Sequence, residues 1–372
     1  MTHPLPELPE GGAFPRRATR AIRVGSVAIG GGAPVSVQSM TNTDTRNVPA
    51  TLAQIQELAA AGCEIVRCAV PDAAAVAGLR ALVAASPLPV IADIHFDYKL
   101  ALAALAAGAA GVRVNPGNLG GRAKLAAVAQ AAARAGAAVR IGVNGGSLEK
   151  RLLAKHGGAT AAALVESAAA SCAVAADAGC ANLKVSLKSS SVPATVAACR
   201  LFAARCDWPQ HIGITEAGTF LGGAIKSAAG LGCLLLEGIG DTLRVSLTAP
   251  PAEEARVGIR ILEACGLRQA QPELVSCPTC GRTQIALQPL AEAVEREIDR
   301  LKAAGWRFKL RKVAIMGCVV NGPGEARDAD LGIAGGAGRG VLFKHGQVVA
   351  TLPEAELLPA LLRELRAAAV PP

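Results

Sequence analysis

Three cysteines in the C-terminal third of the chain have the spacing of a metal site. Cys277 and Cys280 form a C-x-x-C pair, and Cys318 follows after 37 intervening residues. Zinc sites, redox dithiols and iron–sulfur clusters all use such a pair, and three thiolates alone do not complete a structural zinc site. A [4Fe–4S] cluster with three cysteine ligands leaves one iron for an oxygen ligand such as Glu325. The spacing favours an iron–sulfur cluster, with a redox dithiol, or zinc completed by Glu325 or His345, as alternatives.

Polar residues, half of them cationic, lie on short β-branched runs in the first 250 residues, mostly near the ends of those runs. Because side chains alternate direction along a strand, polar residues two apart share one face and their apolar neighbours share the other. We therefore expect the polar set to point into a closed sheet and the apolar set to pack against helices. The polar set comprises Arg67, Asp93, Arg113, Asn115, Arg140, Asn144, Lys188, Glu216, Arg244 and Ser246.

The charges in this set predict an anionic ligand. The cations outnumber the carboxylates of Asp93 and Glu216, and burying unpaired cations is costly. A bound polyanion removes that cost, because arginine contacts phosphate in bidentate geometry and lysine adds a point charge. The pattern predicts a site for a phosphorylated small substrate, with a structural ion-pair network as the alternative. Arg140 is the weakest member of the set, because it starts its predicted strand.

Two other side chains in this region can do acid–base chemistry. Glu216 directly follows the run Ile212–Thr215 and can act as an acid, a base or a stabiliser of charge, or form a salt bridge with a neighbouring cation. His95 follows Asp93, and a lone histidine is more often a packing or hydrogen-bonding residue than a catalyst.

The elements that position these residues alternate between strand and helix eight times. This is the pattern of a (β/α)8 TIM barrel, whose active site lies at the carboxyl ends of its strands, rather than of an open doubly wound sheet. We expect an α/β protein in which residues 1–268 form an N-terminal extension and a substrate-binding barrel, with a long loop or extra helical turn over Gly145–His156. The predicted strands are Val35–Met40, Ile65–Val70, Val90–Ile94, Val112–Asn115, Val139–Asn144, Leu183–Lys188, Ile212–Glu216 and Leu243–Leu247.

Residues 269–372 are expected to form a smaller α/β iron–sulfur domain. Pro272–Arg282 is predicted to be a loop that carries the first two cysteines. Gly335–Gly340 is predicted to be a flexible turn rather than a nucleotide-binding loop. The other predicted elements are the helices Pro289–Ala304 and Pro353–Ala368, the strand Val313–Val320, and a hairpin of Val341–Phe343 with Val348–Thr351.

The composition narrows the class of protein. Of 372 residues, 51% are hydrophobic, which excludes a disordered chain, and 38 basic against 29 acidic residues give a net charge of +9 that favours anionic partners. The longest uncharged stretch, Val24–Thr43, is interrupted by proline, glycine and amide residues, and Met1–Gly12 has no apolar signal core. Eleven cysteines without an export signal favour a reducing compartment, and the eight outside the motif are expected to be core residues. We therefore expect a cytoplasmic protein with no membrane association.

Seven motifs together resemble the 4-hydroxy-3-methylbut-2-en-1-yl diphosphate synthase family, in its short two-domain bacterial form. The similarity runs from about Arg20 to Leu352, and the cysteine block is its most specific part. One departure is Gly305–Lys312, which is longer and more basic than is usual in the family. The motifs are Pro34–Asn42 (PVSVQSMTN), Asp93–His95 (DIH), Arg113–Asn118 (RVNPGN), Arg140–Asn144 (RIGVN), Gly213–Thr219 (GITEAGT), Cys277–Arg282 (CPTCGR) and Gly317–Glu325 (GCVVNGPGE).

The resemblance implies an iron–sulfur oxidoreductase of the methylerythritol phosphate pathway of isoprenoid biosynthesis. Such an enzyme reductively opens 2-C-methyl-D-erythritol 2,4-cyclodiphosphate and releases 4-hydroxy-3-methylbut-2-enyl diphosphate and water. The two electrons come from reduced flavodoxin or ferredoxin, and the sequence does not distinguish these donors. The family is homodimeric, and the cluster domain of one subunit caps the barrel of the other, so that the active site is shared.

The resemblance also assigns roles to residues. Cys277, Cys280, Cys318 and Glu325 fall on the ligand positions of one [4Fe–4S] cluster per chain. Glu216 falls on the acid that faces the cluster, so Glu216 and Glu325 are the candidate catalytic residues. The diphosphate-binding positions are Arg67, Arg113, Arg140, Asn144, Lys188, Arg244 and Ser246.

Two other functions are compatible with some of these residues. A lysine-dependent aldolase would form a Schiff base at Lys184 or Lys188, but this leaves the cysteines unexplained. A nucleic-acid-binding protein with a zinc module would use the net charge of +9, but only 2% of residues are aromatic and there is no long basic run. We therefore expect no nucleic-acid partner.

Overall fold

The chain divides into two compact units. In the computed structural model, residues 14–269, 271–318 and 326–371 are described, and the division falls between Arg268 and Gln269. Each unit has its own sheet and its own hydrophobic core.

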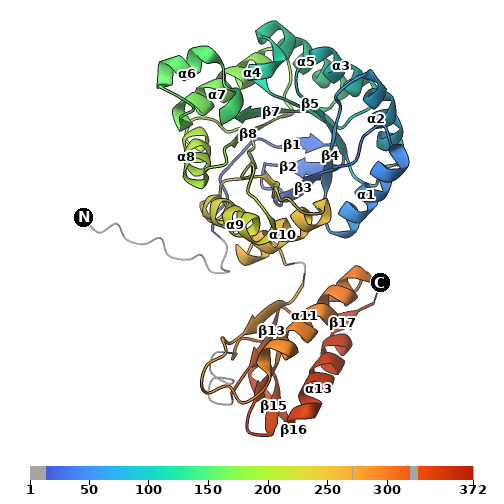
Figure 1. Cartoon of the computed structure of the whole chain (residues 1–372), viewed down its shortest axis with the longest axis vertical. Coiled ribbons are helices and arrows are strands. Elements are labelled where there is room, and N and C mark those ends of the chain that lie inside the picture. Colours follow the sequence, from blue (N-terminus) through green and yellow to red (C-terminus); the bar gives the residue numbers. More distant parts are fainter. Residues whose placement is uncertain (1–13, 270, 319–325, 372) are drawn as a thin grey trace, which may run out of the picture. The chain divides into compact units, whose positions relative to one another are not determined.

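Eight parallel strands in the described part of the first unit form a barrel (Figure 1). Each strand hydrogen-bonds to the next in the order β8-β7-β6-β5-β4-β3-β10-β9. Val185 on β8 forms a parallel bridge with Gln210, just before β9, which brings the two ends of this order together. The predicted TIM barrel is confirmed. The strands are β3 (Ser36–Met40), β4 (Ile65–Ala69), β5 (Val90–Ile94), β6 (Gly111–Val114), β7 (Ala138–Asn144), β8 (Leu183–Lys188), β9 (His211–Ile212) and β10 (Thr242–Leu243).

Helices surround these strands in Figure 1. Several begin at a capping side chain: Asp72, Asp97, Thr160 and Ser191 each accept a hydrogen bond from a backbone N–H of the first turn. The extra helical segment predicted over Gly145–His156 is present as η1 and α6. Among the described residues of either unit, no helix combines the length and apolarity that a membrane crossing needs. The helices are α1 (Val48–Ala60), α2 (Ala73–Ala85), α3 (Tyr98–Ala106), α4 (Pro116–Leu119), α5 (Arg122–Ala135), η1 (Gly145–Ser147), α6 (Lys150–His156), α7 (Ala161–Asp177), α8 (Val192–Ala203), α9 (Phe220–Leu236) and α10 (Pro251–Ala264).

A hairpin that was not predicted packs on the barrel. β1 (Ile22–Val24) pairs antiparallel with β2 (Val27–Ile29). Its apolar side chains pack with Ile65, Ile91 and Ala138, which lie at or near the starts of β4, β5 and β7. This apolar cluster covers the amino-terminal end of the barrel, so the interior opens toward the carboxyl ends of the strands, where TIM-barrel sites lie.

The last two strands are shorter than predicted. β9 ends at Ile212 and β10 at Leu243, so the predicted extensions to Glu216 and beyond Ser246 are wrong. Glu216 has a φ of 53°, a left-handed conformation that a strand does not contain. Glu216, Arg244 and Ser246 therefore lie on the segments that follow the strands.

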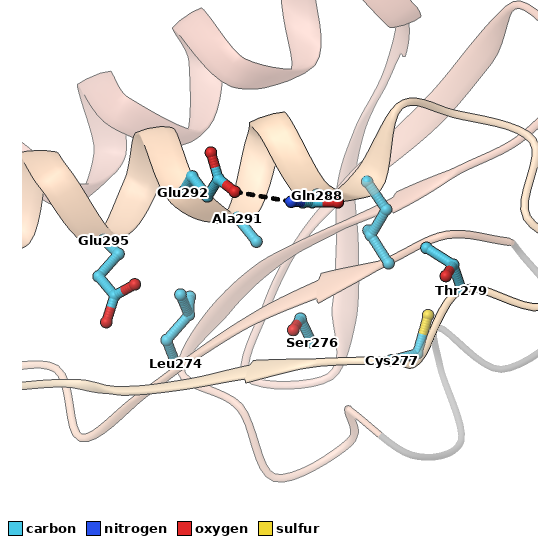
Figure 2. Close-up of a pocket in the computed structure, with 9 residues that line it drawn as sticks. Leu274, Ser276, Cys277, Thr279, Gln288, Ala291, Glu292 and Glu295 are labelled. Atoms are coloured by element: carbon cyan, nitrogen blue, oxygen red, sulfur yellow. Dashed lines mark hydrogen bonds between the residues drawn. The ribbon is translucent and has the colours of Figure 1, made fainter. Parts of the chain in front are cut away.

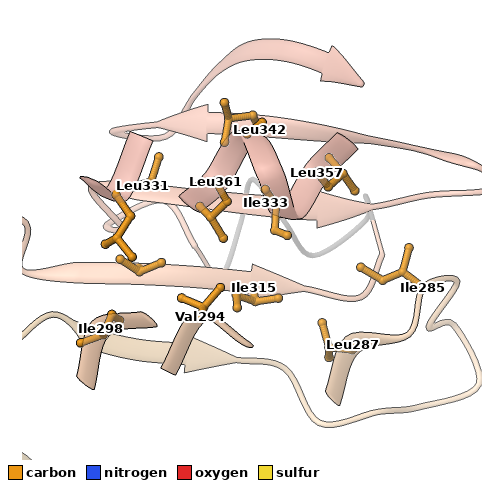
Figure 3. Close-up of a cluster of buried hydrophobic side chains, with 13 residues drawn as sticks. Ile285, Leu287, Val294, Ile298, Ile315, Leu331, Ile333, Leu342, Leu357 and Leu361 are labelled. Carbon is orange, nitrogen blue, oxygen red and sulfur yellow. The ribbon is translucent and has the colours of Figure 1, made fainter. Parts of the chain in front are cut away.

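The second unit is an α/β domain, as predicted, and its described residues form a mixed five-stranded sheet. β11, β13 and β14 are parallel, whereas β15 and β16 continue the sheet antiparallel. α11 and α13 pack on one face through an aliphatic core (Figure 3), in which Ile315 of β13 shares a cluster with Val294 and Leu361 of the helices. The elements are β11 (Glu273–Ser276), α11 (Leu287–Ala303), β12 (Arg307–Phe308), β13 (Lys312–Met316), β14 (Leu331–Gly335), β15 (Arg339–Lys344), β16 (Gln347–Pro353), α13 (Glu354–Ala367) and β17 (Ala369–Val370).

Some local predictions for this unit need correction. The segment Pro272–Arg282 is not all loop, because its first part forms β11. The predicted strand Val313–Val320 ends at Met316, and its last two residues lie outside the described residues. Gly335–Gly340 connects and partly forms β14 and β15, so it is a hairpin turn. The segment Gly305–Lys312, which was expected to depart from the family pattern, contains β12, which pairs antiparallel with β17. The hairpin predicted across His345 is confirmed as β15 and β16.

Candidate active site

Charged side chains from four adjacent strands meet inside the barrel. The parallel register places Asp93 of β5 beside Arg113 of β6, Arg113 beside Arg140 of β7, and Arg140 beside Lys184 of β8. Residues paired in this way share one face of a sheet. Their exposed fractions are 2%, 6%, 2% and 0% in that order. The barrel interior therefore contains a buried, mostly cationic band.

Asp93 neutralises part of this band. Its carboxylate oxygens lie 3.7 Å from Arg67 Nε and 3.5 Å from Arg113 Nη1, and His95 Nε2 lies 3.3 Å away on an exposed ring. Burial alone raises the pKa of a carboxyl group, but Arg67, His95 and Arg113 outweigh it and hold the pKa of Asp93 well below its usual range. Asp93 therefore remains ionised at neutral pH.

Glu254, in the first turn of α10, supplies a second buried carboxylate. It accepts hydrogen bonds from Arg244 Nε and Nη2 at 3.1 and 3.2 Å, and from Ser39 Oγ at 2.8 Å. The expectation that Glu216 balances a buried cation is wrong, because its side chain is exposed. Glu254 instead supplies the carboxylate that balances Arg244.

The cations have hydrogen-bonding capacity that the protein does not fill. Among the described residues, Arg140 Nε and Nη1, Arg113 Nε and Lys184 Nζ have no hydrogen-bond partner. Arg67 Nη2 donates to the thioether sulfur of Met40 at 2.9 Å, and a thioether is a weak acceptor. In the described part of the barrel, six cations thus share the interior with two carboxylates. The cations are Arg67, Arg113, Arg140, Lys184, Lys188 and Arg244, and the carboxylates are Asp93 and Glu254.

Burial and like charges lower the pKa values of the bases in this interior. Burial, and then the charges of Arg67 and Arg113, lower the pKa of Arg140 well below its usual value. Burial, and then Arg140 and Arg67, do the same to Lys188. Burial lowers the pKa of Arg67 to about 10 even though Asp93 opposes it. An anion among these groups would offset both the lost hydration and the repulsion, so the interior favours a polyanionic ligand.

Two glycines leave room for the cations. A β-carbon added at Gly142 would lie 2.6 Å from Arg113 Nε, and one added at Gly213 would lie 2.6 Å from Lys188 Nζ. A larger residue at either position must displace its neighbouring cation. At these two positions glycine is needed because it leaves space for a neighbouring charged side chain, not because the chain turns there.

The remaining predicted substrate-binding residues lie at the carboxyl ends of the strands. Asn144 ends β7 and is paired in register with Lys188, which ends β8. Arg244 and Ser246 follow β10. The charges of Arg67, Arg113, Arg140 and Arg244 all act on Lys188, so the structure brings the predicted cations together.

Glu216 lies on the segment between β9 and α9 and is exposed. Its φ of 53° costs a non-glycine residue on the order of 1 kcal/mol. Strain of this kind persists where the surrounding structure imposes it, and it is common at functional sites. The conformation is therefore consistent with a functional role for Glu216.

Two of the predicted cluster ligands follow neighbouring parallel strands of the second unit. Cys277 follows β11, and Cys318 lies two residues beyond β13. The backbone N–H of Gly317 donates to Cys277 Sγ at 3.2 Å. This hydrogen bond holds the sulfur of Cys277 against the residue that precedes Cys318.

Cys280 is tied to the same strand end. Cys280 N–H donates to Thr283 Oγ1 at 3.0 Å, and Gln284 N–H donates to the carbonyl of Gly317 at 2.9 Å. A β-carbon at Gly317 would lie 2.9 Å from Thr283 Cγ2, so the turn packs closely on this glycine. The turn that carries Cys277 and Cys280 therefore returns to the backbone beside Cys318.

The thiol of Cys280 differs electrostatically from the thiols of the barrel. Hydrogen bonds from the backbone and side chain of Arg282 lower the pKa of Cys280. Burial instead raises the pKa of Cys63 to about 11 and that of Cys199 to about 12. The thiolate is the form that binds metals, so Cys280 is prepared to act as a ligand and the buried barrel thiols are not.

The donor set suits an iron–sulfur cluster. All eleven cysteines are free thiols, and an N–H group already donates to one of the three candidate sulfurs. In residues 14–269, 271–318 and 326–371, no three Cys, His, Asp or Glu side chains are arranged to coordinate a metal ion. Glu325, the fourth predicted ligand, lies outside the described residues. The ligand set stays a prediction.

A pocket of about 410 Å³ borders Cys277 (Figure 2). β11 contributes Leu274 and Ser276, and α11 contributes Gln288 and Glu292, whose side chains are joined by a hydrogen bond of 2.9 Å. One side of Cys277 therefore faces a partly polar pocket.

Several residues of the barrel interior were not among the predicted site residues, Lys184 of β8 among them. Met40 and His211 lie on strands and follow the same alternation as the predicted residues, so this pattern was the available signal. Glu254 comes from a helix, and strand alternation gives no signal for it. Only the three-dimensional structure places it beside Arg244.

Comparisons with known proteins match both units. The GcpE TIM-barrel domain matches residues 19–259, and the GcpE protein C-terminal domain matches residues 273–367. The 4-hydroxy-3-methylbut-2-en-1-yl diphosphate synthase (flavodoxin) of Geobacter sulfurreducens is 59% identical over 347 residues, which cover 93% of this chain and 97% of that protein. The protein of the same name from Maridesulfovibrio salexigens is 54% identical over 351 residues, which cover 94% and 96%. This chain belongs to the GcpE family of 4-hydroxy-3-methylbut-2-en-1-yl diphosphate synthases.

Proposed function

We propose that this chain reductively opens 2-C-methyl-D-erythritol 2,4-cyclodiphosphate to 4-hydroxy-3-methylbut-2-enyl diphosphate, in the methylerythritol phosphate pathway of isoprenoid biosynthesis. The observation that carries this proposal is the barrel interior, where six described cations face two carboxylates. A cyclic diphosphate brings two negative charges to that interior. The names of the similar proteins support the same reaction.

The reaction consumes two electrons and two protons. The bond from C2 to the diphosphate oxygen breaks, the hydroxyl of C3 leaves as water, and a double bond forms between C2 and C3. The diphosphate stays attached to C4 throughout. Groups that hold the diphosphate therefore keep the reacting carbons in place while the ring opens.

The barrel residues bind and orient the diphosphate in this proposal. Guanidinium groups make charge-assisted, bidentate hydrogen bonds to phosphate oxygens, and the lysine adds a point charge. Their unfilled donors, and the space kept by Gly142 and Gly213, support this role. The proposed substrate-binding residues are Arg67, Arg113, Arg140, Asn144, Lys188, Arg244 and Ser246.

Glu216 is the proposed proton donor. Its carboxyl group supplies a proton to the departing C3 hydroxyl, which leaves as water. Its place between β9 and α9, at the carboxyl ends of the strands, and its constrained backbone support this role.

Cys277, Cys280, Cys318 and Glu325 are proposed to hold one [4Fe–4S] cluster per chain. When bound, the cluster supplies single electrons and a Lewis-acidic iron, which no side chain provides. The three thiols and the hydrogen bond from Gly317 to Cys277 support this assignment. Glu325 completes the ligand set and is the second candidate catalytic residue.

The proposed electron donor is reduced flavodoxin, which the names of the similar proteins specify. Reduced ferredoxin is the alternative that the assay distinguishes. The functional unit is proposed to be a homodimer in which the cluster domain of one subunit caps the barrel of the other. A cytoplasmic location is proposed because eleven free thiols suit a reducing compartment.

An anaerobic turnover assay tests the reaction. The protein is incubated with the cyclic diphosphate and chemically reduced flavodoxin, and with reduced ferredoxin in parallel, and the products are separated by ion-pair chromatography. We expect the linear diphosphate to accumulate with at least one donor. Unchanged substrate with both donors, in protein of full iron content, contradicts the proposal.

Mixing two inactive variants tests the shared site. Arg140→Met removes a barrel cation and Cys318→Ser removes a cluster ligand, so neither variant alone should turn over substrate. If the site is shared between subunits, a mixed dimer contains one intact site and activity returns. If each site lies within one chain, every chain carries a defect and the mixture stays inactive.

A further inference from the structure

Two further buried basic groups lie in the barrel interior, outside the set proposed to bind the diphosphate. Lys184 of β8 and His211 of β9 are 0% and 1% exposed. Among the described residues, Lys184 Nζ and His211 Nε2 have no hydrogen-bond partner, and His211 Nδ1 lies 3.4 Å from Thr242 Oγ1. The mechanism above gives neither side chain a role. A buried amine and a buried imidazole that lack hydrogen-bond partners need an explanation.

The surroundings of this pair are cationic. Lys184 is paired in register with Arg140, and the charges of Arg140 and Arg67 act on it. Burial lowers the pKa of His211, and the charges of four neighbouring bases lower it further: Lys188, Arg140, Lys184 and Arg67. The other polar and charged groups that the described strands and α10 contribute to this interior are Ser36 and Gln38 (β3), Arg67 (β4), Asp93 (β5), Arg113 (β6), Arg140 (β7), Ser186 and Lys188 (β8), Thr242 (β10), Arg244 (after β10) and Glu254 (α10).

The carboxylates of this interior are engaged elsewhere. Asp93 lies against Arg67 and Arg113, and Glu254 lies against Arg244. The apolar hairpin β1–β2 covers the amino-terminal end of the barrel. A counter-charge for the protonated forms of Lys184 and His211 must therefore come from a ligand that enters at the carboxyl ends of the strands.

We propose that Lys184 and His211 extend the anion site of the barrel, and that this pair takes up a proton when the cyclic diphosphate binds. This inference rests on the proposed function. In the ligand-free barrel, burial and then Arg140 lower the pKa of Lys184, and burial and then Lys188 lower the pKa of His211. The two negative charges of the bound ligand oppose the positive charge of the surrounding bases. They raise the pKa values of Lys184 and His211 and so favour the protonated forms of both.

The proton must be taken up by the protein rather than by the ligand. Each phosphorus of a cyclic diphosphate diester carries one strongly acidic hydroxyl, which is ionised at neutral pH in solution. The ligand therefore has no group that takes up a proton near neutrality. The direction follows from linkage: a group whose pKa rises on binding makes binding tighter at low pH and weaker as pH rises.

Isothermal titration calorimetry in buffers of different ionisation enthalpy measures this uptake. The holoenzyme is titrated anaerobically with the cyclic diphosphate near neutral pH, without an electron donor, so that no turnover occurs. We expect uptake of about one proton per ligand and a Kd that rises about tenfold per pH unit in the coupled range. Binding without proton uptake overturns this inference and leaves the proposed function intact, whereas absence of any binding overturns both.

Single-residue variants test whether Lys184 and His211 are the groups that take up the proton. Lys184→Met and His211→Gln are each expected to reduce proton uptake and to flatten the pH dependence of Kd. Lys155→Met, which removes an exposed lysine paired with Glu166, is the matched control and should leave both unchanged. His95→Gln tests the exposed imidazole beside Asp93 as another source.

The variants can contradict the assignment as well as support it. Full uptake in both Lys184→Met and His211→Gln, or loss of uptake only in His95→Gln, overturns it. If a variant does not fold, the wild-type titration still decides whether a proton is taken up. Lys184→Met is expected to fold, because it replaces a buried amine that lacks a hydrogen-bond partner with an apolar side chain of similar length.

Discussion

Gly142 on β7 lies against the guanidinium of Arg113 on β6, so that a β-carbon at Gly142 would come within 2.6 Å of Arg113 Nε. Gly142→Ala should therefore displace the guanidinium while leaving the strand intact. We expect binding of the cyclic diphosphate to weaken about tenfold to a hundredfold, the scale of one or two hydrogen bonds to a charged group. Calorimetric titration of the anaerobic protein measures this change.

Gly222→Ala is the matched control for that substitution. Gly222 lies in α9, and nothing lies within 4 Å of a β-carbon built there. Alanine at Gly222 should leave affinity unchanged and slightly stabilise the helix. Unchanged affinity in Gly142→Ala as well would contradict the placement of Arg113 at the diphosphate.

Asp93→Asn should destabilise the ligand-free protein and make its stability depend on a bound anion. Removal of the carboxylate leaves Arg67 and Arg113 without their counter-charge, and breaking a buried ion pair costs about 3–5 kcal/mol. The control Asp207→Asn breaks an exposed pair with Arg20 and should cost at most about 1 kcal/mol. Urea unfolding with and without pyrophosphate measures both, and pyrophosphate should restore much of the loss in Asp93→Asn alone.

The same carboxylate contributes a pH dependence. Because the pKa of Asp93 is lower in the folded protein than in the unfolded chain, its stabilising contribution is present at neutral pH and is lost as pH falls below about 5. The wild-type protein should therefore lose stability in acid more steeply than Asp93→Asn. Parallel acid-unfolding curves for the two proteins would be evidence against the assigned charge state.

Replacing Glu216 with glycine should stabilise the protein but reduce its turnover. Its φ of 53° suits glycine, so Glu216→Gly should raise the free energy of unfolding by about 1 kcal/mol while turnover falls at least about a hundredfold. Glu216→Gln should lose turnover without gaining stability. His345→Gly relieves a similar φ of 46° in the second unit and should leave turnover unchanged. Full activity in Glu216→Gln removes this residue from the chemistry.

The barrel was predictable because its signals are local and repeated. β-branched runs and alanine-rich stretches alternate along the chain, and the alternation within Arg113–Asn115 and Lys184–Lys188 indicates which side chains point inward. The hairpin β1–β2 was missed because its strands are only three residues long. The overlong predictions for β9 and β10 have a different cause, since apolar residues continue past the last ladder pair of these two strands.

The sequence predicted most of the charged residues that form the site, but not which of them contact one another. Arg140 looked weakest by spacing, yet its register with Arg113 and Lys184 places it at the centre of the charged band. Glu254 reaches Arg244 from a helix, and that contact depends on how α10 packs on the barrel. In the second unit the cysteine spacing was sufficient to propose a cluster, whereas the contact of Gly317 with Cys277 depends on the pairing of β11 with β13.

Cys318→Ser should lose the iron chromophore and turnover together. Serine keeps the size of the side chain but provides a poor ligand for iron, so the second unit should still fold. Cys206→Ser, in the first unit and outside the predicted ligand set, should keep both properties. Visible absorption and turnover are measured on the same anaerobic samples. A Cys318→Ser protein that retains its full absorption is not bound to iron through this sulfur.

The most direct test of the central claim is iron, sulfide and zinc analysis of the wild-type protein purified without oxygen, combined with its visible spectrum. We predict a brown protein with about four irons and four sulfides per chain, as a single [4Fe–4S] cluster requires. A colourless protein without iron, or one that holds zinc in its place, would contradict the account.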